Sequence, residues 1–351
     1  MKSKSLTLVL AGLFILSFGL FAAGQQEGSK SDDKITLGTS IRTLQNPYQA
    51  NYKVGGDLFG ATVGMEQVVL TCEGSSEKQL NDIKALVAKT GAKMVLMVDP
   101  NEAPNVVPIG RAMEDAGVYW VSWWNKPDEV KVMDYPHWVA HISYDGLGGG
   151  EFTAQALIDS IGGQGKIIAL QGMLANSVAQ NRFKGLQNVL AKNPGVELVA
   201  YEAADWDRSI AYDKTLSMLV ANPDIKGVWA ANDNMALGAL EALRSKGLAG
   251  KVLVTGLDGV DEIMTAIQNG EAAATVYNDS KYQAGIAHAL ALAAYRGELD
   301  VASLPAEKRQ FFANAVNVDA NNVQEVIDVY VNGTPKYDYT DLFGAWARAM
   351  K

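Results

Sequence analysis

Short apolar runs of β-forming residues alternate with segments of helical periodicity from about Lys34 to about Tyr295. Runs such as Met94–Val98 are apolar at every position, which is expected when helices cover both faces of a parallel sheet. This alternation predicts the α/β class, with doubly wound parallel sheets. Strands are predicted at Ile35–Ser40, Gln67–Thr71, Met94–Val98, Tyr119–Ser122, Val139–Ile142, Lys166–Leu170, Val196–Ala200, Gly227–Ala231, Val252–Leu257 and Ala273–Tyr277.

Ten strands are more than one open sheet holds comfortably, so we predict two sheets in two lobes. The chain has 351 residues, of which 48% are hydrophobic, and this is enough for two domains with separate cores. Glycines follow several helical segments, as left-handed C-caps require. Helices are predicted at Glu77–Lys89, Asn105–Ala116, Phe152–Ile161, Val178–Ala191, Ser209–Val220, Met235–Lys246 and Lys281–Tyr295.

The first residues have the order of a secretory signal peptide. Lys2 and Lys4 precede an uncharged apolar run, Leu6–Ala23, which ends in small residues. We predict cleavage after Gly24, so that 1–24 is the signal and 25–33 a flexible lead-in. An uncleaved membrane anchor is the alternative, since the run is long enough to span a bilayer.

We also predict how the chain is divided between the two lobes. The segment Asn125–Trp138 carries two prolines and no clear period, and we expect it to run over the surface towards a lobe boundary. One lobe is predicted to comprise 34–143 and 279–314, and the other 144–278 and 315–351. The C-terminal tail is thus expected to pack on the second lobe.

Charge and cysteine content restrict the partners. The net charge is −9 and there is no basic run, which disfavours binding to nucleic acid or to anionic lipid. Cys72 is the single cysteine, so neither an internal disulfide nor a multi-thiolate metal site is expected. It does not lie at the end of the signal, where a lipid-modified cysteine would be needed. We expect an exported, periplasmic or extracytoplasmic monomer without cofactor or metal.

The residues that follow the predicted strands share a chemistry. In an open parallel α/β sheet, ligands bind beyond the carboxyl ends of the strands. Amides and carboxylates there can exchange hydrogen bonds with vicinal hydroxyls, and aromatic faces can pack against a sugar ring. Each Asn or Asp could instead be a helix cap or turn former. The candidate ligand-binding residues are Asn46, Tyr48, Gln49, Trp124, Asn125, Tyr144, Met173, Arg182, Trp206, Asn232, Asp258 and Asn278.

Five stretches of the sequence have a familiar form. They are SIRTLQNPYQ (Ser40–Gln49), ALQG (Ala169–Gly172), AADWDR (Ala203–Arg208), ANDNMALGAL (Ala231–Leu240) and TGLDG (Thr255–Gly259). In this order they resemble the ribose-binding-protein group of periplasmic sugar-binding proteins, the substrate receptors of ABC importers. The resemblance implies a type I periplasmic-binding fold, with two lobes joined by three crossovers and a monosaccharide closed between them. It implies an inner-membrane ABC permease as partner, and is compatible with a chemoreceptor as a second one.

The resemblance also implies roles for particular residues. The ligand contacts of the group correspond here to Asn46 and Tyr48 in the first lobe, to Arg182, Trp206, Asn232 and Asp258 in the second, and to Asn278 on the hinge side. Ribose-type members carry an Asp-Arg pair where this chain has Trp124 and Asn125, and an aromatic residue where it has Gln49. We therefore expect a monosaccharide other than ribose, or a linear polyol.

Other functions fit the sequence less well. Gly38 is followed by Thr-Ser-Ile-Arg, which lacks the glycine cradle of a dinucleotide-binding enzyme. The run Gly162–Lys166 precedes a predicted strand, so we interpret it as a turn and not as a phosphate loop. Asp233 and Asp258 could form the acid–base pair of an exported hydrolase. A gene regulator would need a DNA-binding motif where this chain has its signal. A nucleoside or a signalling molecule is the alternative ligand.

Overall fold

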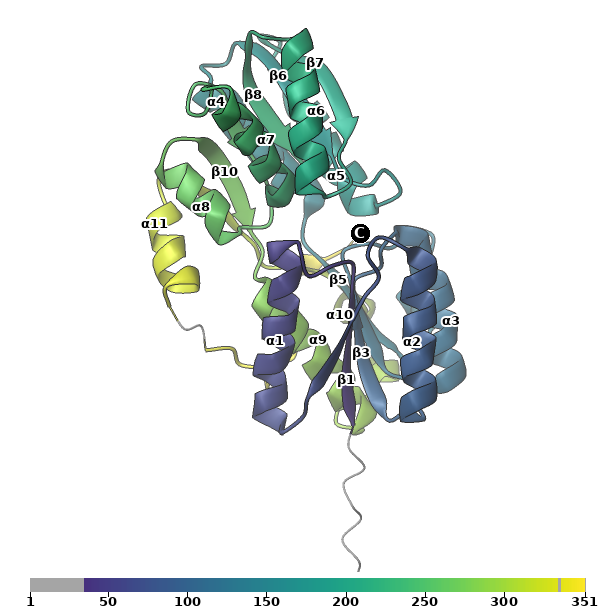
Figure 1. Cartoon of the computed structure of the whole chain (residues 1–351). Helices are drawn as coiled ribbons and strands as arrows, with labels where there is room; N and C mark the ends of the chain where they lie inside the picture. Colours follow the sequence, from purple (N-terminus) through teal and green to yellow (C-terminus); the bar gives the residue numbers. More distant parts are fainter. Residues whose placement is uncertain (1–34, 334–335, 351) are drawn as a thin grey trace, which may run out of the picture. The chain divides into compact units, whose positions relative to one another are not determined.

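The structure is a computed structural model that describes residues 35–333 and 336–350. The predicted signal and lead-in lie outside these residues. The described strands form two sheets, with seven strands in the order β13-β11-β5-β4-β3-β1-β2 and six in the order β12-β10-β9-β8-β6-β7 (Figure 1). Helices flank both sheets, which confirms the prediction of two doubly wound α/β lobes.

The first sheet is parallel except at one edge, where β13 pairs antiparallel with β11. Its strands are β1 (Thr36–Ile41), β2 (Gln67–Thr71), β3 (Met94–Val98), β4 (Trp120–Trp123), β5 (Trp138–Ser143), β11 (Gln310–Ala313) and β13 (Trp346–Ala349). The second sheet is likewise parallel except for β12, which pairs antiparallel with β10. Its strands are β6 (Gly165–Gln171), β7 (Val196–Ala203), β8 (Ile225–Ala230), β9 (Leu253–Thr255), β10 (Ala272–Tyr277) and β12 (Val316–Asp319).

Each sheet has its own helices. Those of the first lobe are α1 (Pro47–Val63), α2 (Ser76–Thr90), α3 (Val106–Ala116), α9 (Ser280–Tyr295) and the short α10 (Ala306–Arg309). Figure 1 shows α1 and α9 on one face of the first sheet and α2 and α3 on the other. The helices of the second lobe are α4 (Gly146–Ser160), α5 (Ser177–Leu190), α6 (Arg208–Ala221), α7 (Asp233–Ser245), α8 (Asp261–Gln268) and the short α11 (Val323–Val326).

Glycines explain two of the places where the helices differ from the prediction. The prediction omits α1, in which three glycines weaken the helical signal. A Cβ at Gly55 would lie 1.9 Å from the carbonyl oxygen of Lys281, so glycine allows α1 and α9 to cross closely. Helix α4 begins at Gly146 and not at Phe152, because its first turns are glycine-rich. A Cβ at Gly150 would lie 2.2 Å from the carbonyl oxygen of Arg182, on the neighbouring α5.

The chain passes between the sheets after β5, after β10, after β11 and again after β12. The predicted placement of 315–351 in the second lobe is wrong for the last strand, because β13 joins the first sheet beside β11. Trp346 explains this position. Its indole donates a hydrogen bond to the carbonyl oxygen of Glu307 over 3.0 Å, and the ammonium of Lys308 lies 4.8 Å from its ring. The chain therefore returns to the first lobe to cover the open edge of β11.

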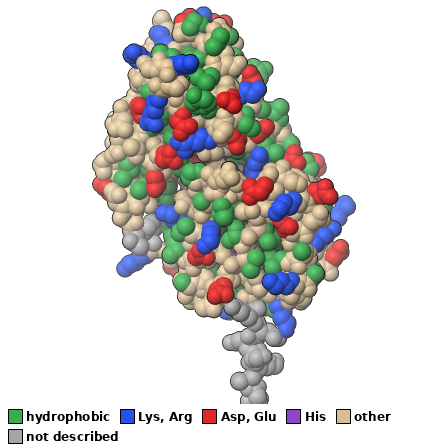
Figure 2. All heavy atoms as spheres, viewed as in Figure 1, with side chains coloured by type: hydrophobic (Ala, Val, Ile, Leu, Met, Phe, Trp, Pro, Cys, Tyr) green, Lys and Arg blue, Asp and Glu red, His purple; other side chains and the backbone are tan. Residues whose placement is uncertain are grey.

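The core of the first lobe contains stacked aromatic rings, and the visible surface carries charges of both signs. In the first lobe, the rings of Trp120 and Trp138 stack at 4.5 Å, and both side chains are fully buried. On the face seen in Figure 2, acidic and basic side chains are interspersed, and no single sign of charge dominates.

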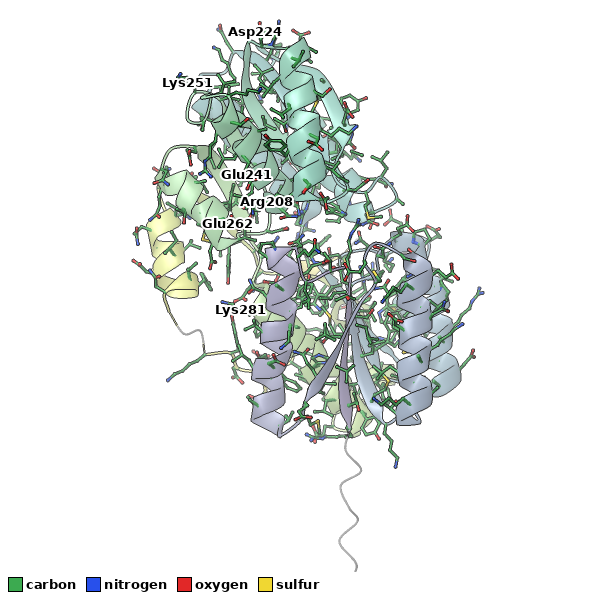
Figure 3. All side chains as sticks on the ribbon, viewed as in Figure 1. Arg208, Asp224, Glu241, Lys251, Glu262 and Lys281 are labelled. Carbon is green, nitrogen blue, oxygen red and sulfur yellow. The ribbon has the colours of Figure 1, made fainter. Side chains whose placement is uncertain are left out.

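In the second lobe, Arg208 at the start of α6 donates hydrogen bonds to Glu241 on α7 and Glu262 on α8 (Figure 3). This network ties three helices together beside the ends of their strands.

Candidate ligand-binding site

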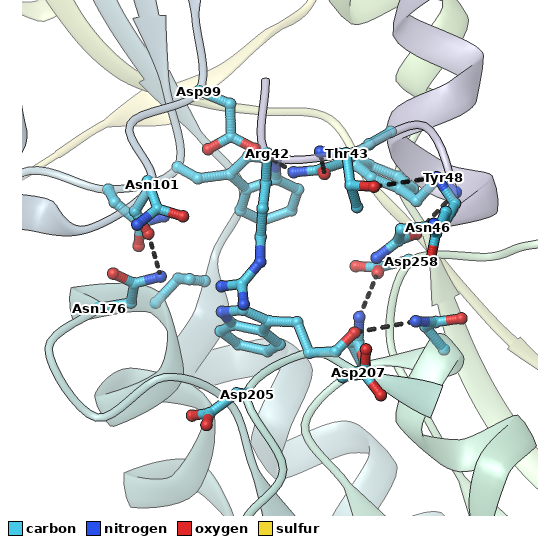
Figure 4. A pocket seen from close by; sticks show the side chains of 18 of the residues that line it. Arg42, Thr43, Asn46, Tyr48, Asp99, Asn101, Asn176, Asp205, Asp207 and Asp258 are labelled. Atoms are coloured by element: carbon cyan, nitrogen blue, oxygen red, sulfur yellow. Dashed lines mark hydrogen bonds between the residues drawn. The ribbon is translucent and has the colours of Figure 1, made fainter. Parts of the chain in front are cut away.

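A cavity of about 390 Å³, here called the cleft cavity, lies where the carboxyl ends of strands from both sheets meet (Figure 4). Its lining comes from the segments that follow β1, β2, β3 and β4 in the first sheet, and β6, β7, β8 and β9 in the second. This is the position at which open parallel sheets bind ligands. Nine of the twelve candidates line it, namely Asn46, Tyr48, Gln49, Trp124, Asn125, Arg182, Trp206, Asn232 and Asp258.

A buried polar triad forms the second-lobe wall. Arg182, which is 3% exposed, donates from Nη1 to the carbonyl oxygen of Ala231 over 2.6 Å and from Nη2 to Oδ1 of Asp258 over 3.3 Å. Asn232 donates from Nδ2 to the other oxygen of Asp258, also over 3.3 Å. Burial raises the pKa of Asp258, and the charge of Arg182 opposes this. An ionised carboxylate can accept about four hydrogen bonds, so these two leave Asp258 able to accept from a ligand donor.

Asp233 supports this wall from behind and does not line the cleft cavity. Its carboxylate accepts hydrogen bonds from the backbone N–H groups of Gly259 and Val260, over 2.6 and 2.9 Å, and from the hydroxyl of Thr275 over 2.8 Å. It therefore fixes the turn that carries Asp258. The pairing of Asp233 with Asp258 as a catalytic acid and base finds no support in this geometry, because Asp233 is fully buried.

The first-lobe wall presents aromatic faces that are held from behind. The hydroxyl of Tyr48 donates to Oε1 of Gln283 over 2.7 Å, and Nε2 of Gln283 donates to the hydroxyl of Tyr52 over 2.8 Å. The indole of Trp124 donates to the same Tyr52 oxygen over 2.7 Å. The hydroxyl of Tyr48 and the indole N–H of Trp124 thus bond to the protein, and the rings of both residues line the cavity. Tyr52 and Gln283 lie inside helices, where no strand-end rule would have found them.

Two of the candidate asparagines cap a helix and also line the cavity. Oδ1 of Asn46 accepts from the backbone N–H of Tyr48 over 2.9 Å, and Oδ1 of Asn232 accepts from that of Met235 over 3.0 Å. Each oxygen caps the helix that follows, α1 in one case and α7 in the other. The amide nitrogens point away from the caps, so the same residue can begin a helix and line the cavity.

Asp99 is a cavity-lining residue that the sequence analysis missed. It directly follows β3, so the rule that pointed to the other strand ends also applies to it. Gln49 holds it in place, because Oε1 of Gln49 accepts from the N–H of Thr43 and its Nε2 donates to Asp99 over 2.9 Å. Burial raises the pKa of Asp99 to about 7, while the bond from Gln49 and the charge of Arg42 lower it. Gln49 thus lines the cavity and also positions Asp99.

Further residues of the lining were also missed. Arg42 reaches from the end of β1 across the cleft cavity to the sulfur of Met173, a candidate that does not itself line the cavity. Asn101 follows β3, and its Oδ1 is buried with no hydrogen-bond partner among the described residues. The same holds for Oδ1 of the candidate Asn125. Buried acceptors without donors are uncommon in proteins, so these two oxygens are suited to accept from a bound molecule.

Tyr144 and Asn278 line a different cavity. This second cavity, here called the hinge cavity, has a volume of about 310 Å³ and lies against the segments that connect the two sheets. The sequence places both residues after strands of the correct lobes. It cannot show that the indole of Trp124 lies between them and the cleft cavity, because that depends on the side-chain direction of one residue.

Backbone strain is concentrated at the cleft cavity. Among the described residues, six that are not glycine have a left-handed backbone, and five of them line this cavity. These five are Glu73 (φ 49°), Trp124 (φ 65°), Asp205 (φ 51°), Trp206 (φ 65°) and Asp258 (φ 139°). Such conformations are uncommon for residues other than glycine and cluster at functional sites. The strain therefore supports this cavity as the site, independently of its chemistry.

Residues 35–333 and 336–350 contain no group of three or more His, Cys, Asp or Glu side chains that could hold a metal ion. No helix in this part of the chain is long and apolar enough to cross a membrane.

Comparison with known proteins places the chain in a family. Residues 37–299 match a family model described as a periplasmic binding protein domain. The crystal structure of a twin-arginine translocation pathway signal protein from Burkholderia phytofirmans has a TM-score of 0.88 to this chain at 42% identity, covering 91% of this chain and 99% of that one.

Three curated relatives cover most of the chain. The D-allose-binding periplasmic protein of Escherichia coli is 31% identical over 240 residues, which are 67% of this chain and 76% of that protein. The ribose import binding protein of Bacillus subtilis is 28% identical over 277 residues, 78% and 87% of the two chains. The xylitol-binding protein of Mycolicibacterium smegmatis is 27% identical over 290 residues, 82% and 80% of the two chains. These matches confirm the resemblance seen in the sequence, and the chain belongs to the periplasmic binding protein domain family.

Proposed function

We propose that this protein is an extracytoplasmic solute receptor of an ABC importer, which binds a monosaccharide other than ribose, or a related polyol, in the cleft cavity. The observation that carries the proposal is the combination in one cavity of a buried polar triad with aromatic faces. Arg182, Asn232 and Asp258 supply the triad, and Tyr48 and Trp206 supply faces from opposite lobes.

The triad matches the hydrogen-bonding of a carbohydrate. A hydroxyl both donates and accepts, so vicinal hydroxyls suit a wall that alternates cationic donors with carboxylate acceptors. Nε of Arg182 is buried without a partner among the described residues, and a ligand oxygen would satisfy it. Hydrogen bonds to charged groups contribute about 1.5–3 kcal/mol each, so two or three of them give specific binding.

The first-lobe wall supports a ligand other than ribose. Trp124 and Asn125 occupy the positions of the charged clamp of ribose-type receptors, and the indole of Trp124 is committed to Tyr52. A carboxylate reaches the cavity instead from Asp99, which follows another strand. A carboxylate in a different position accepts a hydrogen bond from a different hydroxyl of the ligand. The relatives named for allose and xylitol show that the family includes receptors of such ligands.

Closure of the lobes is the proposed signal to the transporter. A ligand that contacts Tyr48 in one lobe and Asp258 in the other favours the closed form by this difference in contacts. We propose that an ABC permease in the inner membrane binds the closed form and accepts the solute, and that a chemoreceptor would recognise the same form. Of the twelve sequence candidates, we propose that the nine that line the cleft cavity contact the ligand. Tyr144 and Asn278 lie on the hinge side of Trp124, and Met173 contacts the lining residue Arg42.

Export by a cleaved signal is part of the proposal. It rests on Lys2, Lys4 and the apolar run Leu6–Ala23. N-terminal sequencing of the mature protein from its own host should begin at Gln25. Recovery of an uncleaved chain in the membrane fraction would contradict export by a cleaved signal without affecting the ligand.

The ligand is tested by a thermal-shift screen of the mature protein against pentoses, hexoses, polyols, nucleosides and amino acids. A ligand at 100 times its Kd stabilises the folded state by about 2.7 kcal/mol, which is a readily measured rise in Tm. We expect a monosaccharide other than ribose, or a polyol, to raise Tm and ribose to have a smaller effect at equal concentration. A flat response to all sugars and polyols, with a shift by a nucleoside or an amino acid, would contradict the proposed ligand class.

A further inference from the structure

The cleft cavity and the hinge cavity meet at a single aromatic side chain. Among the described residues, Trp124 and Arg182 line both cavities, and they have no other lining residue in common. Arg182 is held from its own lobe by Ala231 and Asp258. Its guanidinium lies 5.0 Å from the ring of Trp124. A flat indole beside this fixed cation therefore forms the boundary between the two spaces.

The indole of Trp124 lies close to one ring from each cavity. Tyr48, which lines the cleft cavity, lies 5.9 Å from it, and Tyr144, which lines the hinge cavity, lies 5.2 Å from it. The hydrogen bond to Tyr52 fixes the indole in its plane. Trp124 is only 7% exposed and has a left-handed backbone with φ 65°. The residue is thus a rigid wall whose position is set by its surroundings.

The hinge cavity has the lining of a binding compartment. Asn278 is 2% exposed, and its Oδ1 has no hydrogen-bond partner among the described residues. Arg348 and Asp145 form an ion pair of 2.6 Å at another side of the cavity, and Leu257 and Val276 add apolar surface. An unpartnered carbonyl beside apolar side chains suits a group that carries hydroxyls.

We propose that the indole of Trp124 restricts the ligand to one ring or a short linear polyol, because it closes the cleft cavity against the hinge cavity. Removal of the indole joins the two cavities beside Arg182. A ligand with a second ring then extends past position 124 to the carbonyl of Asn278. This inference rests on the proposed function, since it concerns the size of the ligand that the same site accepts.

The test compares Trp124→Gly with the wild-type mature protein. Glycine keeps the backbone at φ 65° without steric cost, so the substitution removes the indole and leaves the loop conformation available. The single-ring or linear probes are D-allose, myo-inositol and xylitol, and the two-ring probes are maltose, cellobiose and lactose. Calorimetric titration should show no two-ring probe bound by the wild type. In Trp124→Gly at least one of them should bind at least tenfold more tightly, and Trp124→Phe should lie between.

Trp206→Gly is the matched control. Trp206 has the same φ of 65° and also lies near the guanidinium of Arg182, at 5.7 Å, but it lines only the cleft cavity. Its removal should weaken the single-ring probes and admit no two-ring probe. Equal gain of two-ring binding in both variants would contradict a special role for Trp124. Two-ring binding by the wild type, or no gain in a folded Trp124→Gly protein, would overturn the proposal.

A binding measurement with free indole, in the absence of sugar, tests this inference separately from the proposed function. A cavity left by a rigidly held indole should bind free indole, as apolar cavities bind apolar molecules of matching shape. Indole should raise the Tm of Trp124→Gly and not that of the wild type, and it should compete with two-ring binding. If no sugar binds any protein, the proposed function fails while the indole result still decides whether Trp124 is a fixed wall. The absence of an indole effect in folded Trp124→Gly would contradict that wall.

Discussion

Asn176 stands at the N-cap position of α5, yet its side chain bonds to the opposite lobe and not to its own helix. Its Oδ1 accepts from the backbone N–H of Ala103 over 3.2 Å, and its Nδ2 donates to the carbonyl oxygen of Asn101 over 3.4 Å. An asparagine at this position ordinarily stabilises its helix by accepting from the first turn. Here that contribution is exchanged for a connection between the lobes at the rim of the cleft cavity.

Replacing Asn176 should therefore favour the open form. In Asn176→Ala the lobes lose two hydrogen bonds, each contributing about 1 kcal/mol, so ligand affinity should fall about tenfold or more. Small-angle X-ray scattering of the ligand-free protein should give a larger radius of gyration than for the wild type. Asn222→Ala is the control, because Nδ2 of Asn222 bonds only within its own lobe, to Met218. An unchanged radius of gyration and affinity in Asn176→Ala would show that the two hydrogen bonds of Asn176 do not hold the lobes together.

Asp258 and Arg182 depend on each other in the interior. Asp258→Ala should leave the guanidinium of Arg182, which is 3% exposed, buried without its carboxylate partner. Loss of one member of a buried pair costs about 3–5 kcal/mol of stability, and loss of the ligand contact should cost about 2 kcal/mol of binding free energy. Urea unfolding and calorimetry with the ligand found in the screen measure the two effects. Binding unchanged in Asp258→Ala would place the ligand elsewhere.

Asp99 should make both stability and binding depend on pH. Its pKa in the folded protein is about 7, raised by burial from an ordinary value of 3.8, so the unfolded chain loses this proton at lower pH than the folded chain does. The contribution of Asp99 to the free energy of unfolding therefore falls as pH rises from about 4 to about 7, by about 1.4 kcal/mol per unit of pKa difference, and is level outside this window.

Binding should respond in the opposite direction. Ligand hydroxyls that donate to Asp99 favour the carboxylate, so affinity should increase between about pH 6 and about pH 8. Calorimetry at these two values, on the wild type and on Asp99→Asn, measures the difference. The asparagine variant should retain only the smaller pH dependence that comes from Asp258, whose pKa is also raised by burial. An equal pH dependence in both proteins would show that Asp99 does not titrate with the ligand.

Gly150 should tolerate no side chain, although it lies within a helix. Alanine normally stabilises a helix by about 1 kcal/mol relative to glycine. A Cβ at Gly150 would lie 2.2 Å from the backbone oxygen of Arg182, so Gly150→Ala must push α4 and α5 apart and shift the guanidinium. We expect a lower Tm and weaker ligand binding. A Tm at or above that of the wild type would show that the helices can separate at no cost.

The fold could be predicted because its signals are local. Strands such as β3 are apolar on both faces, and glycines such as Gly91 and Gly117 end helices in left-handed caps. The edge strand β13 was not predicted, because none of its four residues is fully buried and they pair only with a segment distant in sequence. The contacts of Trp346 with Glu307 and Lys308, which hold it there, are visible only in the folded chain.

The sequence could predict those site residues that follow the ends of strands. Arg182, Asn232 and Asp258 follow from that rule and from the family resemblance, and they meet in one cavity. The division by Trp124 could not be predicted, because it depends on a left-handed backbone and a hydrogen bond to Tyr52 inside α1. Nor does the sequence reveal residues that act through others, as Gln283 does through Tyr48 and Tyr52.

The central claim is that the cleft cavity holds a monosaccharide other than ribose, or a polyol. The most direct test is to purify the mature protein from its own host under native conditions, unfold it, and identify the released small molecule by mass spectrometry. We predict a monosaccharide other than ribose, or a polyol, in close to equimolar amount, and its loss from Asp258→Ala purified in the same way. Release of ribose, a nucleoside or an amino acid from the wild type would contradict the claim.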